Sequence, residues 1–183
     1  MFVNIYVQPI YVFVVCTILG LLLWIIMNIC YEDSKLIVFV NTSIAIAGVF
    51  VILFCTLIGR EAGEHYLELT PLISLKKAKI QPEYYRTLLL NTILFIPFGL
   101  GLAGVLPKRY SLIRRCLIVI VAGLVLSVGI EATQYIFRLG EAEMDDVLAN
   151  ITGAVVASLA LCIEQLIKKT YLALGKRATR RNE

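Results

Sequence analysis

The stretch SVGIEATQYIFRLGEAEMDDVLANITG, residues 127–153, decides how the rest of the chain can be arranged. It places a carboxylate, two amides, an arginine and an acidic pair between apolar segments on both sides. Ionisable side chains are costly in hydrocarbon and face either other helices or a water-filled cavity. We therefore treat the polar groups of this stretch as a candidate functional site within a membrane protein.

The composition of the whole chain agrees with that class. Of the 183 residues, 60% are hydrophobic and only 16% are charged, and the mean hydropathy is +0.87. A soluble domain would expose too much of this apolar surface to water. The net charge of +4 is unevenly distributed and bears on membrane topology, so we predict membrane lipids as partners and no nucleic acid.

The chain offers little for metal or cofactor chemistry. Its five cysteines have no ligand spacing and are interpreted as small apolar residues. His65 lies in a polar connector without a cysteine or a second histidine to complete a metal site. No metal and no cofactor is predicted. The amino terminus lacks a basic region and a cleavage signature, so its apolar run is interpreted as a retained anchor.

Five runs have the roughly 20 apolar residues that a bilayer span requires. A lone span must satisfy its own backbone hydrogen bonds, so each run is predicted to be a helix. These runs are Ile5 to Cys30, Leu36 to Gly59, Leu88 to Leu106, Leu117 to Phe137, and Val147 to Ile167. The expected fold is an all-α polytopic membrane bundle of about five transmembrane helices. Its parts are an anchor helix (1–34), a four-helix core (35–168) and a basic tail (169–183).

The connectors set the expected orientation. Cations between the third and fourth helices and in the tail fall on one side, and the positive-inside rule makes that side cytoplasmic. The amino terminus is then outside and the carboxyl terminus inside. The connector from Arg60 to Arg86, broken by Pro71 and Pro82, faces outward. We expect it to contain a short interfacial or re-entrant element, with a solvated loop as the alternative.

Polar residues follow one face of the predicted fourth helix. At 100° per residue, Ser127, Glu131, Gln134 and Arg138 fall within an arc of about 60°. Arg138 lies at the outer end, where it can reach the headgroups. Glu131 lies about two turns deeper, roughly 10 Å further into the membrane. This stripe must face neighbouring helices rather than lipid.

The neighbouring helices complete the set. On the fifth helix, Asp146 and Asn150 share a face with Gly153, and Asp145 or Asp146 could instead cap that helix. Small residues at this spacing allow close helix packing. The predicted ligand-binding residues are Arg60, Asn91, Glu131, Gln134, Arg138, Asp146 and Asn150. The alternative for these residues is a set of interhelical hydrogen bonds that only fix the packing.

Three ordered motifs carry a family resemblance. LNTILFIPFGLGL fits the pattern N-x-x-x-F-x-P-x-G, IEATQYIF fits E-x-x-Q, and GEAEMDDVLANITGA fits D-V-x-x-N-x-x-G. In this order they resemble the VanZ-like family of bacterial membrane proteins over about residues 50–160. The resemblance assigns structural roles to Pro71, Phe95, Pro97, Gly99 and Gly153. The departures are Glu68, Leu72 and Glu143, where the family more often has asparagine, phenylalanine and aspartate.

The resemblance implies a small integral membrane protein, in a family named for a member linked to resistance against teicoplanin, a lipidated glycopeptide. The first hypothesis is a non-enzymatic protein that binds a lipid-linked or lipophilic ligand in the outer half of the membrane. The second is a membrane-embedded enzyme acting on a lipid headgroup, with Glu131 or Asp146 as general acid or base. The third is a lipid transporter, which with five spans would need a dimer, or a membrane scaffold.

Overall fold

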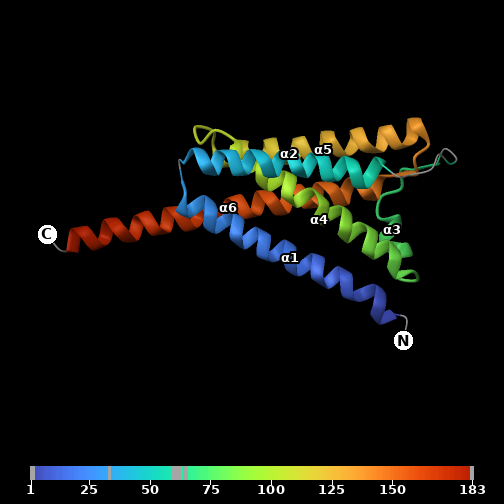
Figure 1. The fold of residues 1–183 in the computed structure, drawn as a ribbon, viewed down its shortest axis with the longest axis horizontal. Helices are drawn as coiled ribbons and strands as arrows, with labels where there is room; N and C mark the ends of the chain where they lie inside the picture. Colours follow the sequence, from blue (N-terminus) through green and yellow to red (C-terminus); the bar gives the residue numbers. More distant parts are fainter. Residues whose placement is uncertain (1–2, 33, 59–62, 64–65, 182–183) are drawn as a thin grey trace.

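A computed structural model describes residues 3–32, 34–58, 63 and 66–181 of the chain. Five long helices dominate it, and each begins within six residues of the start of a predicted span (Figure 1). They are α1 (Val3–Cys30), α2 (Lys35–Leu57), α4 (Pro82–Val105), α5 (Leu112–Phe137) and α6 (Met144–Arg181). All five are long and apolar enough to cross a membrane. The predicted all-helical fold, with five long apolar helices that could span a membrane, is therefore confirmed.

The short elements lie in the polar connectors. Strand β1 (Tyr66–Glu68) pairs in parallel with β2 (Glu141–Glu143), and Leu67 lies opposite Ala142. Helix α3 (Ile73–Lys77) follows β1. The connector that we expected to hold a short interfacial or re-entrant element thus contains β1 and α3. We call the end of the bundle with β1, α3 and β2 the strand end, and the end with connector 106–111 the basic end.

Helix α4 lies at the centre of the bundle and packs against α2 on one side and α6 on the other (Figure 1). Glycines of α4 allow this close packing, because some of them face α2 and others face α6. A Cβ at Gly101 would overlap the backbone of α2 at Ala45, and one at Gly99 would overlap the Cβ of Ala157 on α6. Helix α4 continues through Pro97, which is exposed on its surface.

The core is divided into two apolar clusters along α4. Phe95 is fully buried and contacts Ile52 of α2 and Ile130 of α5 in one cluster. The other joins Leu100 to Leu161 of α6 and to Trp24 of α1. A large apolar side chain removed from solvent contributes about 1.5–3 kcal/mol, so these clusters fix the helix packing independently of the polar groups.

Helix α1 is the most peripheral of the long helices. It diverges from the bundle towards its amino-terminal end (Figure 1), and most of its large apolar side chains are exposed. A buried amide network holds its other end. The Nε1 of Trp24 donates to the Oδ1 of Asn41 at 2.8 Å, and the Nδ2 of Asn41 donates to Asn28 at 2.9 Å. Asn41 is 0% exposed, so the hydrogen bonds that join α2 to α1 are buried.

Candidate functional site

Glu131 lies where α5 meets the short strands. Its side chain is buried on the inner face of α5 and accepts a hydrogen bond from the backbone N–H of Glu143, at 3.1 Å. Because Glu143 ends β2, this bond joins the predicted deep carboxylate of α5 to the strand pair. The fourth-helix stripe therefore supports the strand end instead of pointing into lipid.

Asp145 organises α3. It is 3% exposed, and its two carboxylate oxygens accept from the backbone N–H of Leu72 (2.5 Å) and from that of Ser74 (2.6 Å). Leu72, the residue before α3, lies in the left-handed region with φ 63°. This conformation costs a non-glycine residue roughly 1–3 kcal/mol and persists only where the surroundings impose it. Asp145 provides that constraint. It stands in the first turn of α6 and also caps a different helix.

Glu143 connects the two carboxylates. It is half-buried and accepts from the hydroxyl of Ser74 at 2.9 Å. Burial raises the pKa of the Glu143 carboxyl above its ordinary value, while the Ser74 hydroxyl and the Lys77 ammonium act in the opposite direction. Glu131, Glu143 and Asp145 thus form one continuous chain of contacts from α5 through β2 to α3, which we call the carboxylate relay.

Two buried amides tie the helices near this relay. Gln134 donates to the carbonyl oxygen of Thr56, in the last turn of α2, at 3.0 Å. Asn150 of α6 donates to the hydroxyl of Ser127 on α5 at 2.9 Å. Each amide has a buried carbonyl oxygen that accepts no hydrogen bond from the described residues. Such oxygens are uncommon in folded proteins.

The structure brings some of the predicted site residues together and leaves others apart. Glu131, Gln134 and Asn150 are buried between the helices of the strand end. Asp146 is half-buried in the first turn of α6, and Asn91 is half-buried on α4. Arg138 ends α5 in a left-handed conformation with its side chain exposed. Arg60 lies outside the described residues.

A groove of about 420 Å³ opens beside the carboxylate relay. Its walls are apolar side chains of α5, α6 and the strands, and two of the relay residues, Glu131 and Glu143, line it as well. We call it the strand-end groove. A concave, mostly apolar site with a few polar groups is the usual form of a small-ligand pocket. On α5 its lining includes Leu124, Val128 and Tyr135.

Comparison with known proteins identifies the chain. Residues 43–165 match the model of the VanZ/LLP1 family, a region that covers more than half of the sequence. The chain belongs to the VanZ/LLP1 family. No curated protein and no solved structure matches it. The predicted resemblance is confirmed, and the protein is a membrane protein of this family.

The VanZ/LLP1 region contains the helix contacts that the three motifs require. Gly153 faces the carbonyl oxygen of Thr92, so close that a Cβ would overlap it. The hydroxyl of Thr92 in turn donates to the carbonyl oxygen of Ala149 at 3.1 Å. The motif glycine of α6 therefore serves close packing against α4, as expected. Phe95, another motif residue, is fully buried and packs edge-on against Phe98, with ring centroids 6.4 Å apart.

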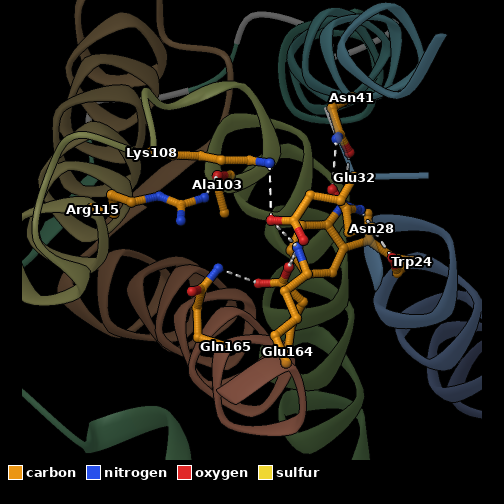
Figure 2. A network of polar contacts seen from close by, with 10 residues as sticks. Trp24, Asn28, Glu32, Asn41, Ala103, Lys108, Arg115, Glu164 and Gln165 are labelled. Carbon is orange, nitrogen blue, oxygen red and sulfur yellow. Dashed lines mark hydrogen bonds and ion pairs between the residues drawn. The ribbon is translucent and has the colours of Figure 1, made fainter. Parts of the chain in front are cut away.

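Sequence reasoning missed a second polar network in this VanZ/LLP1 protein, at the basic end (Figure 2). The Nη2 of Arg115 donates to the carbonyl oxygen of Ala103 at 2.7 Å. Lys168 forms ion pairs with Glu164 (2.5 Å) and Glu32 (3.0 Å). Arg115 and Glu164 are both nearly fully buried. The sequence feature that could have predicted this network is Glu164, an acidic residue inside the fifth apolar run.

Sequence reasoning also missed Asp145 and Ser74 as partners. It considered Asp145 only as a cap of its own helix, and nothing in the spacing connects it to the backbone N–H of a residue 71 positions away. Of the two adjacent aspartates, Asp145 is the more deeply buried. The structure therefore adds Asp145, Glu143 and Ser74 to the predicted set.

Proposed function

We propose that this VanZ/LLP1 membrane protein binds a lipophilic or lipid-linked ligand in the strand-end groove. The observation that carries the proposal is the composition of that groove, an apolar cavity of about 420 Å³ with Glu131 and Glu143 in its lining. The apolar walls suit a hydrocarbon chain, and the carboxylates suit a polar group at the end of that chain.

The lining favours a ligand whose polar end donates hydrogen bonds. Carboxylates accept hydrogen bonds and attract cations, whereas a phosphate would be repelled by them. The sequence suggested Arg138 as an anion-binding group, but Arg138 is exposed and does not belong to the described lining of the groove. An amine or a sugar hydroxyl attached to a lipid therefore fits better than a phosphate alone.

Photocrosslinking tests the proposal directly. The purified protein is incubated with a diazirine-bearing phosphatidylethanolamine or with the matching phosphatidylcholine, which lacks the N–H donors. We expect stronger crosslinking of the amine lipid, and loss of that difference in Glu143→Gln. Val128→Trp should block labelling because it fills the groove, whereas Val125→Trp, on a different face of the same helix, should leave it unchanged.

Two results would reject the groove as the site. One is equal labelling of wild type and Val128→Trp. The other is crosslinked peptides that map elsewhere than to α5, α6 or the strands. Equal labelling of the two lipids by the wild type would keep the groove and reject the role of the carboxylates.

A ligand in the strand-end groove could connect this protein to susceptibility of the cell envelope to antibiotics. A lipidated glycopeptide of the teicoplanin type carries both a hydrocarbon chain and sugar donors, so it is one ligand of the right class. Expression in a susceptible bacterium should raise the inhibitory concentration of teicoplanin but not that of a glycopeptide without a lipid chain. An equal effect on both compounds, or none, counts against this extension.

The orientation that this function needs places the strand end outside the cell. The positive-inside rule supports it because the basic end carries Lys108, Arg109, Arg114 and the tail cations. Single cysteines at Glu141 and Arg109, both exposed, should label from opposite sides in a cysteine-free background. Labelling of the cysteine at position 109 from outside the cell would show that the orientation is the opposite of the one proposed.

A further inference from the structure

A second groove, of about 620 Å³, runs between α2 and α5 towards the basic end. We propose that it binds one anionic phospholipid, with an acyl chain along the groove and the phosphate at Arg114. This site lies apart from the strand-end groove and does not depend on the function proposed above. We call it the arginine groove.

Helix packing explains why the arginine groove exists. Helix α2 packs mainly on α4, and α5 packs mainly on α6, so α2 and α5 meet each other over only a short length. The space between them is lined by Phe98 of α4, Val49 of α2, and apolar side chains of α5 such as Leu117, Val121 and Val125. The groove is thus a consequence of the order of the helices.

The charge at the groove favours an anion. Among the residues that the structure describes, Arg114 is the one charged side chain that lines it. The guanidinium of Arg114 stacks 4.1 Å from the ring centroid of Tyr110, and that of Arg109 lies 5.6 Å from the same ring. Two cations thus flank one aromatic side chain at the mouth of an apolar groove.

The acids described at this end are already engaged. Glu32 forms ion pairs with Lys108 (2.9 Å) and Lys168, and Glu164 forms an ion pair with Lys168. An anion from outside the chain is therefore the natural partner of the two guanidinium groups. A bidentate guanidinium–phosphate contact provides both charge and geometry.

The length of the groove matches one leaflet of a bilayer. Its α5 lining extends from Arg114 to Leu126, which at 1.5 Å per residue is about 18 Å. Half the hydrocarbon thickness of a bilayer is about 15 Å. A headgroup held at Arg114 would therefore place its acyl chain along the whole groove. The two grooves differ in ligand chemistry, with carboxylates at one and guanidinium groups at the other.

Native mass spectrometry of the full chain in detergent, titrated with phosphatidylglycerol or with phosphatidylcholine of the same acyl chains, tests the site. We expect the wild type to prefer phosphatidylglycerol at least about fivefold and Arg114→Gln to lose about fivefold in that affinity, the effect of one cation at an anionic surface. Lys35→Gln removes an exposed cation at the same end, outside the groove lining, and should retain the preference.

Groove-filling variants separate this site from the one proposed above. Val125→Trp should reduce phosphatidylglycerol binding, whereas Val128→Trp should not. Equal binding of both lipids by the wild type overturns the proposal, as does full affinity in Arg114→Gln or Val125→Trp. An equal loss in Lys35→Gln and Arg114→Gln would show a diffuse basic surface and would also overturn it. Circular dichroism confirms that each variant is folded.

Discussion

Replacing Asp145 by alanine should release α3 from the bundle while the long helices stay packed. The side chain accepts two short backbone hydrogen bonds, from Leu72 and Ser74, and is almost fully buried. A hydrogen bond to a charged group contributes about 1.5–3 kcal/mol. Taking the lower value for each bond gives a loss of about 3 kcal/mol, which corresponds to roughly 100-fold in the local opening equilibrium.

Hydrogen exchange followed by mass spectrometry measures this opening. Peptides covering residues 66–81 should exchange about 100-fold faster in Asp145→Ala, because removal of the cap also frees Leu72 to leave its left-handed conformation. Peptides from the middle of α4, around Phe95, should be unchanged. Asp145→Asn retains one acceptor oxygen and should have an intermediate effect of about tenfold.

The comparison of the two variants makes the reasoning refutable. If α3 keeps its wild-type protection in Asp145→Ala, the carboxylate does not hold it. If these peptides exchange equally fast in Asp145→Asn and Asp145→Ala, the negative charge of Asp145, rather than its pair of acceptor oxygens, holds α3. An exchange increase spread over all helices would mean that Asp145 supports the whole bundle.

The remaining predictions concern other parts of the bundle. Burial raises the pKa of Glu143, so the folded state holds this proton more tightly than the unfolded state. Stability should therefore fall as the pH rises above about 4.5, and thermal melts of Glu143→Gln should show a smaller fall. Gly101→Ala should cost about 1–3 kcal/mol because its Cβ overlaps the backbone of α2, whereas Gly129→Ala, with nothing within 4 Å, should not destabilise. The sulfurs of Cys116 and Cys162 lie 3.7 Å apart, so a mild oxidant should link α5 to α6; peptide mapping that finds both thiols free would contradict this packing.

The long helices follow from the sequence because they depend on local properties. Each apolar run is long enough to span a bilayer, and a span isolated in lipid must form its backbone hydrogen bonds within itself. The polar face of α5 also followed from spacing alone, since Ser127, Glu131 and Gln134 are all buried on it. Helical periodicity fixes which residues share a face without any knowledge of the partner helix.

Partners between helices did not follow from the sequence. Periodicity identified Gln134 and Asn150 as inward-facing, but not the Thr56 carbonyl or the Ser127 hydroxyl as their acceptors. Either aspartate of the adjacent pair could have capped a helix, and only the docking of α3 decided in favour of Asp145. Such choices depend on contacts between residues distant in the chain.

The placement of charged groups separates most clearly what the sequence determined from what the tertiary structure decided. The sequence by itself determined that the chain forms a membrane helix bundle with inward-facing polar groups, because the cost of exposing such groups to lipid is a property of each residue. Only the tertiary structure decided that carboxylates line the groove at the strand end and that a guanidinium lines the groove near the basic end. The grooves themselves arise where packed helices diverge, and that depends on which small residues meet across an interface.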